Sequence, residues 1–555
     1  MGGLGPGHAL RYPAATVTAP APLELGDALE ALVGQFADPW SFLREMIQNS
    51  IDAGSLEIEI CVEHDVAESV MTIEIIDNGE GMDREIIDTR LTRLFSSAKD
   101  GDYTKIGRFG IGFVSVFAID PDVVCVDTAR AGQHWRILFR RDRSFERILL
   151  DAPGEGTTVR IYCKADEPAY EAARIRALAT LRYWCRYAHV EIRFNGESMS
   201  ERLGVDSICS ARLEEEGSEV VVGLWPEAEA PRGYYHGGLT LHEEVGGEGS
   251  IPYLTFKIDS RFLEHTLTRD NVIRDENYAK AMALVERAAS GPLLVALFAQ
   301  LGQIAAGVRA QRDEDQQTAL CEAAIRHLNC GAQLPGECRT LPVFPTLGGA
   351  PISISELETL QGELHCDRIR SPVTDRLASR GRPVLDTAIG DGIYRLAEAI
   401  TGVRASSANT ALCLAAAAPN AAEDQRWHDF ANAVRGLLLA DGVKLGGIAI
   451  GDLDYPGSPV ALRVAISQRK LGELTPVLEA SRLGRSLFSS ARFVVLNAGH
   501  ALLKSLLIGG VVAAEPELAA YLVTKLLYLR EELSPERDGH LARRAMEGRC
   551  RRLTS

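Results

Sequence analysis

The chain has 555 residues, of which 46% are hydrophobic and 24% charged, and 59 basic against 76 acidic side chains give a formal net charge of −17. This composition is typical of a globular protein and disfavours the collagen-like, fully disordered and disulfide-scaffold classes, while the length predicts about three or four domains. The acidic balance disfavours nucleic acid as a partner because the field of the whole molecule repels phosphate backbones, although a local basic groove would remain compatible with it.

The cysteines indicate a reducing compartment. Eleven of them are scattered along the chain without a CxxC pair, as expected for free thiols in a cytosol-like environment. The nearest approach to a metal site is formed by Cys330, Cys338, His365 and Cys366. Their spacing fits no standard zinc signature and favours ordinary buried thiols.

The N-terminus lacks the features of a secretory signal, and apolar runs such as 506–514 are too short to cross a bilayer. We therefore expect a cytoplasmic protein without a membrane partner.

The first 200 residues predict helices followed by a sheet. Residues 1–22 are rich in Gly, Pro and Ala and predict a loose tail. Apolar residues at helical spacing predict two helices within 25–52, divided at Asp38-Pro39. Further helices are expected at 85–95, 112–119 and 167–187, and strands at 56–63, 71–79, 122–128, 134–139, 146–150 and 157–163, with a last strand ending near 197. This order predicts an α/β sandwich with its helices on one face.

The rest of the chain is less regular. Acidic, turn-rich stretches interrupt a β-rich region after residue 198, and residues 276–307 predict a helix. A hairpin with its turn at 347–349 opens a third region. The expected C-terminal helix carries Leu518, Leu522, Leu526, Leu529 and Leu533 on one face. This stripe, which Lys525 interrupts, fits a core helix and a helix that pairs two protomers equally well.

Three short segments carry chemistry, and the first is the predicted helix around REMIQNSIDAG. Glu45, Asn49 and Asp52 are spaced so that they share one helical face. A carboxylate such as Glu45 is suited to activate water as a general base, and the amide oxygen of Asn49 is a hard ligand suited to magnesium. A solvated polar face explains this segment alone equally well.

The second segment is Asp77-Asn78-Gly79-Glu80-Gly81-Met82, at the end of a predicted strand. The Asp77 carboxylate is suited to accept a hydrogen bond from an exocyclic amine such as that of adenine, and the glycines allow a flat base to approach the backbone. An ordinary Asp-Asn-Gly turn is the alternative.

The third segment, GRFGIGF at 107–113, opens an apolar helix. Its glycines free backbone N–H groups to cradle phosphate oxygens at a helix N-terminus. A dinucleotide-binding motif is disfavoured because no strand precedes these glycines.

The three segments, in this order within about 70 residues, resemble the ATPase domain shared by gyrase B subunits, ninety-kilodalton heat-shock chaperones, histidine kinases and MutL proteins. This superfamily is known as GHKL, and its α/β sandwich as the Bergerat-type fold. Gly156-Thr157 is similar to its GT motif, whose threonine helps to hold the adenine-binding carboxylate. The resemblance implies ATP and Mg²⁺ as ligands, with Glu45 as general base, Asn49 as Mg²⁺ ligand and Asp77 as adenine acceptor. The further nucleotide-binding residues that it implies are Asp52, Gly79, Gly81, Met82, Lys99, Gly107, Gly110, Ile111, Gly112, Phe113 and Thr157.

Within the superfamily, REMIQNSIDAG and IGRFGIGFVSVFAI are most similar to the chaperone branch. Residues 256–275 resemble the segment of those chaperones in which an arginine reaches the ATP γ-phosphate, and Arg269 is the matching position. A guanidinium suits this role because it stays charged and binds phosphate through a fixed fork of donors. An ion pair of Arg269 with Asp270 or Glu264 is the alternative. The family's lid is shorter than usual here, which leaves the role of Lys99 open.

The resemblance implies an α/β chain with a tail at 1–22, a GHKL ATP-binding domain at 23–197, an α/β middle domain at 198–338 and an α/β or mostly helical C-terminal region at 339–555. It implies an ATP-dependent chaperone that acts on client proteins as a homodimeric clamp, in protein folding and the stress response. Two alternatives use the same ATPase domain: a nucleic-acid-linked clamp akin to MutL or a topoisomerase, and a defence or signalling ATPase with one dedicated partner.

Overall fold

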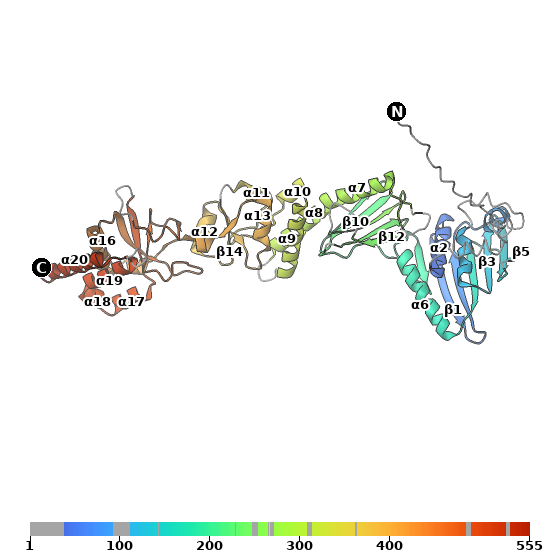
Figure 1. Cartoon of the computed structure of the whole chain (residues 1–555), viewed down its shortest axis with the longest axis horizontal. Coiled ribbons are helices and arrows are strands. Elements are labelled where there is room, and N and C mark those ends of the chain that lie inside the picture. Colours follow the sequence, from blue (N-terminus) through green and yellow to red (C-terminus); the bar gives the residue numbers. More distant parts are fainter. Residues whose placement is uncertain are drawn as a thin grey trace, which may run out of the picture.

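The computed structural model describes residues 38–554, apart from 93–110, 143, 228, 247–252, 265, 267–270, 308–312, 361–362, 423, 484–489 and 529–532. The chain is elongated, with its parts arranged in a row (Figure 1). The sheet that contains β1 and β3 lies near one end, and the helices α16 to α20 lie at the other (Figure 1).

An eight-stranded sheet with helices packed against it forms the first part of the chain. Its strand order is β5-β4-β3-β6-β2-β1-β7-β8, and β1 and β7 pair in parallel while the other neighbours pair antiparallel. The strands are β1 (Glu57–Asp65), β2 (Val70–Asp77), β3 (Val123–Arg130), β4 (Gln133–Arg140), β5 (Phe145–Leu149), β6 (Thr157–Lys164), β7 (Glu191–Phe194) and β8 (Glu197–Ser198). The helices are η1 (Pro39–Ser41), α2 (Phe42–Asp52), α3 (Arg84–Ile86), η2 (Ile87–Leu91), α5 (Ile111–Val114), η4 (Ser115–Ile119) and α6 (Glu167–Trp184).

Alternation along the strands explains why the helices cover this sheet. Ile58, Ile60 and Val62 of β1 are buried, while the residues between them are more exposed. These buried side chains share one core cluster with apolar residues of α2, α5 and α6. Burying apolar area is the main stabilising term of such a sandwich. The expected α/β architecture is confirmed, and the described helices and strands lie close to the ranges that the sequence predicts. The tail expected at 1–22 and the first of the two helices expected within 25–52, before Asp38-Pro39, lie outside the described residues.

Two short helical segments differ in detail from their predictions. The helix expected at 85–95 begins at Arg84 and changes to a π-helical turn at Ile87–Leu91. Residues 93–95 lie outside the described part of the chain. The helix expected at 112–119 is an α-helical turn followed by the 3₁₀ turn Ser115–Ile119. It ends at Asp120, whose φ of 51° lies in the left-handed region and prevents further helical winding.

A five-stranded sheet, in the order β12-β11-β13-β10-β9, forms the second part. Its elements are β9 (Ser210–Glu215), β10 (Ser218–Leu224), β11 (Pro231–His236), β12 (Leu239–Val245), β13 (Leu254–Ser260), α7 (Glu276–Ser290), α8 (Pro292–Ala306), α9 (Glu314–Asn329) and α10 (Gly336–Thr340).

One helix pair in this part meets the length and composition test for a membrane span. Helices α7 and α8 together, Glu276–Ala306, are long and apolar enough to cross a membrane by length and composition alone. The pair divides at Gly291-Pro292, and half of its most apolar stretch is buried inside the protein. Its buried side chains share a core cluster with the five-stranded sheet. A pair of core helices passes the same test of length and composition, since helices buried in protein are also rich in apolar residues.

The third part combines small sheets with helices. Its elements up to residue 422 are α11 (Ile354–Thr359), β14 (Leu364–Asp367), α12 (Pro372–Ser379), β15 (Leu385–Asp386), α13 (Gly392–Thr401), β16 (Ala405–Ser407), α14 (Ala408–Ala411), β17 (Leu412–Cys413), β18 (Ala416–Ala417) and α15 (Pro419–Ala422). The later elements are α16 (Gln425–Ala440), β19 (Leu445–Asp452), β20 (Ala465–Gln468), β21 (Thr475–Pro476), β22 (Arg492–Asn497), α17 (Ala501–Ile508), α18 (Val511–Ala514), α19 (Pro516–Tyr528) and α20 (Pro535–Thr554). The pairing of Phe344 with Ile352 closes the expected hairpin, with Gly348 at a positive φ in its turn.

The leucine stripe of the C-terminal helix is divided between core and surface. Ala519, Ala520 and Val523 of α19 form its buried face, together with Thr524 and Tyr528. Leu526 and Leu533 pack against the same core, whereas Leu518 is 47% and Leu522 39% exposed. Leu529 lies outside the described residues.

The hydrophobic cores follow the chain in order. One cluster fills the first part and also includes Leu239 of β12, a second runs from Cys209 to Ala405, and a third gathers Trp427 to Ala545. The second cluster includes residues on both sides of position 338. The domain boundaries expected at 197 and 338 stay predictions.

Candidate functional site

Helix α2 positions the first group of predicted site residues. Glu45 is buried, with 8% of its surface exposed, whereas Asn49 and Asp52 are exposed on successive turns. Asp52 accepts a hydrogen bond of 2.9 Å from the side-chain amide of Gln48, one turn earlier. A carboxylate as buried as Glu45 is unusual on a surface helix, because desolvating a charge costs free energy. Asn49 and Asp52 therefore lie exposed on this helix, whereas Glu45 is turned toward the interior.

Arg44 anchors this helix against α6. Its guanidinium lies 4.5 Å from the centre of the Trp184 ring, and the residue is only 6% exposed. Burial lowers the pKa of Arg44 from its ordinary value, since the surrounding protein disfavours the charged form. The aromatic face compensates part of this cost through its quadrupole.

Asp77, at the end of β2, is held by three donors. Its Oδ2 accepts a hydrogen bond of 2.8 Å from the Ser50 hydroxyl of α2, and its Oδ1 accepts bonds of 3.0 and 3.2 Å from the backbone N–H groups of Gly79 and Thr157. A carboxylate offers about four lone-pair positions. Three are used by donors in the described part of the chain, which leaves one for a ligand donor such as an exocyclic amine.

The backbone around Asp77 is packed too closely for side chains. A Cβ added to Gly81, which has a φ of 67°, would lie 2.1 Å from the Ala129 carbonyl oxygen. A Cβ on Gly156, with a φ of 64°, would lie 2.0 Å from the Asp77 carbonyl oxygen. At Gly79 the nearest atom would be the Ala53 carbonyl oxygen, 2.9 Å away. The glycines of the DxGxG and GT segments therefore bring the ends of β2, β3 and β6 together, in addition to any role toward a ligand.

Hydroxyl groups join these strand ends. Thr128 Oγ1 of β3 accepts a hydrogen bond of 2.8 Å from the Met82 N–H, and the hydroxyls of Thr128 and Thr157 lie 3.0 Å apart. Asp77 and Thr157 are directly paired between β2 and β6. The predicted residues Met82 and Thr157 thus belong to the same network as Asp77.

Helix α5 brings the third segment against α2. A Cβ added to Gly112 would lie 3.1 Å from Glu45 Oε2 and 3.8 Å from Asn49 Nδ2. The glycine therefore lets the backbone of α5 approach the Glu45 carboxylate more closely than a residue with a side chain would. Phe113 points into the core, where its ring lies 5.2 Å from that of Phe139. Ile111 begins the helix.

Four predicted residues lie outside the described part of the chain: Lys99, Gly107, Gly110 and Arg269. Their placement is untested, and their roles stay predictions.

Sequence reasoning missed three residues of this site. Ser50 donates to Asp77, Thr128 bridges Met82 and Thr157, and the Asn78 side-chain oxygen accepts hydrogen bonds from Ser55 Oγ and from the Leu56 and Glu57 N–H groups. Asn78 therefore fixes the chain between α2 and β1. Ser50 follows Asn49 in the first motif, which is the one local signal that could have indicated it. Thr128 carries no such signal because its partners are distant in sequence.

No group of three or more His, Cys, Asp or Glu side chains within the described ranges is arranged to hold a metal ion. Cys338 is buried in the second core, and His365 faces the Ser406 hydroxyl at 3.2 Å.

Comparison with known proteins indicates what this arrangement is similar to. Residues 37–147 match the family described as histidine kinase-, DNA gyrase B- and HSP90-like ATPase. The chain is 32% identical over 177 residues to the chaperone protein HtpG of Anaplasma phagocytophilum, covering 26% of this chain and 28% of the relative. It is 30% identical over 218 residues to HtpG of Nitrosospira multiformis, covering 33% of each chain.

A DNA mismatch repair protein is also similar. The chain is 25% identical over 263 residues to MutL of Streptococcus sanguinis, covering 41% of this chain and 37% of the relative. The matches span about a third of the length of these curated relatives. They confirm the resemblance of this chain to the GHKL ATPases and to the HtpG chaperones among them.

Proposed function

We propose that this protein is an ATP-dependent molecular chaperone of the ninety-kilodalton heat-shock type. The observation that carries the proposal is that helix α2, which contains the first motif, contacts the second and the third motif. Helix α2 contacts Asp77 through Ser50, and it lies against Gly112 through Glu45 and Asn49. The similarity to HtpG over part of the chain supports the chaperone assignment over the other GHKL classes.

The residues present fit ATP with Mg²⁺. Asp77 retains a lone pair that would accept the amine hydrogen of adenine. Asn49 is an exposed residue, and a single hard oxygen from the protein suits Mg²⁺, which keeps most of its other positions for phosphate and water. When bound, the ion would supply charge neutralisation at the phosphates. Among the residues outside the described ranges, Gly107 and Gly110 would donate backbone N–H groups, Lys99 would lie in the lid, and Arg269 would reach the terminal phosphate.

Glu45 would act on the attacking water. Its carboxylate is buried and lies so close to Gly112 that a Cβ there would approach Oε2 to 3.1 Å. It would accept a proton from water as the water oxygen bonds to the terminal phosphorus and the bond from that phosphorus to the bridging oxygen breaks, with ADP as the leaving group. General base catalysis of this kind contributes roughly 10²- to 10⁴-fold to a rate.

The homodimeric clamp and its client proteins are part of the same proposal. The HtpG similarity supports them, and the exposed Leu518 and Leu522 of α19 offer apolar surface for pairing. We also propose a cytoplasmic location, which the eleven free cysteines support because disulfides are rare there.

Removing the base tests the catalytic part. We expect Glu45→Ala to lose nearly all ATP hydrolysis, by roughly 10²-fold or more, while ATP binding is largely kept. Glu63→Ala is the matched control, since it removes an exposed carboxylate from β1 of the same domain. Phosphate release measures hydrolysis and calorimetry measures binding. Persistent hydrolysis in Glu45→Ala contradicts the assignment.

A second candidate is a nucleic-acid-linked clamp, which the similarity to MutL favours. Two assays on the full chain separate the candidates. A chaperone suppresses the aggregation of a denatured client protein in an ATP-dependent manner, and its hydrolysis does not respond to DNA. Stimulation of hydrolysis by DNA without any effect on aggregation favours the second candidate.

A further inference from the structure

A cavity of about 750 Å³ lies near the C-terminal end of the molecule, between helices α16 and α20 and the start of α19. This volume lies within the usual range of ligand sites. Its charged lining residues are Arg426, Asp429, Glu517, Arg544, Arg551 and Arg552. Four cations therefore face two carboxylates, in a chain whose overall charge is −17.

Two of the four arginines are neutralised by ion pairs. Arg552 donates to the Glu517 carboxylate at 3.0 Å, and Arg426 donates to Asp424 at 2.6 Å. The other lining carboxylate, Asp429, accepts a hydrogen bond of 3.0 Å from Gln425.

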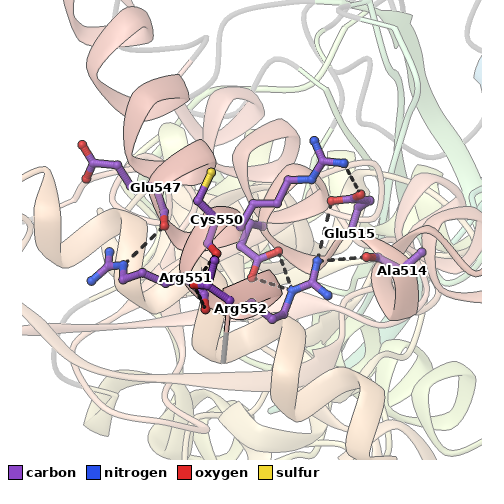
Figure 2. A network of polar contacts seen from close by, with 9 residues as sticks. Ala514, Glu515, Glu547, Cys550, Arg551 and Arg552 are labelled. Carbon is purple, nitrogen blue, oxygen red and sulfur yellow. Dashed lines mark hydrogen bonds and ion pairs between the residues drawn. The ribbon is translucent and has the colours of Figure 1, made fainter.

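The positive charges of the other two arginines, Arg544 and Arg551, are compensated less closely by carboxylates. Arg544 lies 3.5 Å from the exposed carboxylate of Glu547, a weak surface pair. Arg551 donates to the backbone oxygen of Glu547 at 3.3 Å, and no carboxylate partner of Arg551 is found in the described part of the chain. Figure 2 shows Arg552 directed toward Glu515 and Ala514, while Arg551 lies on the side of Glu547.

The walls of the cavity are made of small residues. Gly436 of α16 and Gly548 of α20 line it, together with Ala433, Ala440 and Ala545. Gly436 lies in a helix interior, where glycine is disfavoured. A Cβ added to Gly436 would meet no atom within 4 Å. The space beside this glycine is therefore open, and close approach of another protein segment does not explain it.

We propose that this cavity, which we call the C-terminal groove, binds an acidic peptide segment of a partner protein. The carboxylates of the peptide would contact Arg551 and Arg544. Arginine presents a planar fork of donors that matches carboxylate geometry. The small apolar wall residues accommodate the side chains between the acids. The proposal is independent of the nucleotide site, since the groove belongs to a different core cluster.

A nucleic acid fits this groove less well. Its lining contains no aromatic side chain on which a base could stack. Asp429 and Glu517 are part of the lining and would repel a continuous row of phosphates, whereas a peptide can place neutral residues beside them.

The test is fluorescence anisotropy on the full chain at low salt. The probes are a labelled peptide of alternating Glu and Ala, a peptide of the same length with Lys in place of Glu, and a single-stranded DNA oligonucleotide. We expect the acidic peptide to bind and the basic one not to bind. The double variant Arg544→Glu, Arg551→Glu should weaken acidic-peptide binding by roughly tenfold or more, because like charges then oppose each other.

Two further variants separate charge from folding. Arg543→Glu is the matched control: it reverses a charge on the same helix, but Arg543 does not line the groove, so binding should be kept. Gly436→Leu fills the open space, and because leucine favours a helix the variant should fold while losing the peptide. The proposal is overturned if the acidic peptide fails to bind, if DNA binds more tightly, or if Arg543→Glu is as damaging as the double variant.

Discussion

At the scale of single residues, Asp77 links three elements of the first part of the chain. Its carboxylate receives donors from α2, from the turn after β2 and from the start of β6. Every one of these neighbours donates, so the Asp77 carboxylate acts as an acceptor toward all three. The same geometry orients the carboxylate, so a ligand amine would meet an acceptor whose direction is already fixed.

Replacing this acceptor should weaken nucleotide binding. In Asp77→Asn the amide nitrogen faces hydrogen-bond donors, and leaving such groups unsatisfied costs about 1–3 kcal/mol. We expect the affinity for ATP, measured by calorimetry, to fall by roughly tenfold or more. Ser50→Ala should have a smaller effect, since Asp77 keeps both backbone donors. Unchanged affinity in Asp77→Asn would remove the proposed adenine contact.

At the scale of elements, the ends of β2, β3 and β6 meet through glycines. Gly156 shows why: its φ is positive, and the space for a Cβ is already occupied by the Asp77 carbonyl oxygen. The hydrogen bond between the Ala129 N–H and the Gly156 carbonyl oxygen continues the contact to β3. This crowding keeps the Thr157 N–H within reach of Asp77.

A methyl group at this position should disrupt the strand ends. We expect Gly156→Ala to destabilise the paired ends of β2 and β6 by more than the roughly 1–3 kcal/mol of backbone strain alone. The added Cβ would also clash with the Asp77 carbonyl oxygen. Gly132→Ala is the control, since Gly132 has a similar φ of 78° but open space for a Cβ. Hydrogen exchange of β2 and β6 measures the difference. Equal protection of the two variants would show that the crowding is unimportant.

Helix α19 also yields a test at this scale. If the exposed Leu518 and Leu522 pair two protomers, Leu518→Asp combined with Leu522→Asp should convert a dimer into a monomer in sedimentation experiments, because a buried unpaired charge is costly. Leu553→Asp, at another exposed leucine near the chain end, should leave the assembly unchanged. A dimer that survives the double substitution would place the contact elsewhere.

At the scale of the whole molecule, a polar joint connects the end of α6 with the five-stranded sheet. His189 Nε2 lies 2.6 Å from the buried Asp259 of β13, and the Thr240 hydroxyl of β12 donates to the Tyr183 carbonyl oxygen at 2.7 Å. Arg186 pairs with Glu243 at 3.2 Å. Contacts of this kind are one physical route by which the first sheet is connected to the rest of the chain.

The joint should respond to pH. The hydrogen bond to Asp259 raises the pKa of His189 above its ordinary value. The contribution of the protonated pair is therefore fully present below about pH 6.5 and is lost as the pH rises through the raised pKa. We expect faster hydrogen exchange across the joint at pH 8.5 than at pH 6, after correction for intrinsic rates.

Histidine variants check the source of this pH effect. His189→Gln should remove the difference between the two pH values, whereas His134→Gln, on the first sheet away from this joint, should retain it. A pH response that persists in His189→Gln would assign the effect to another group.

The sequence alone determined the local part of this protein: the strands from alternation, the helix α2 from the spacing of its apolar residues, and the three motifs from their order. Such patterns depend on neighbours a few residues apart, so they can be read without a fold. The folded structure was needed to show that Ser50 holds Asp77, that Gly112 lies close to the Glu45 carboxylate, and that arginines and small residues of distant helices share one groove. Those contacts join residues far apart in the chain, and they follow from strand register and helix packing, which no local pattern specifies.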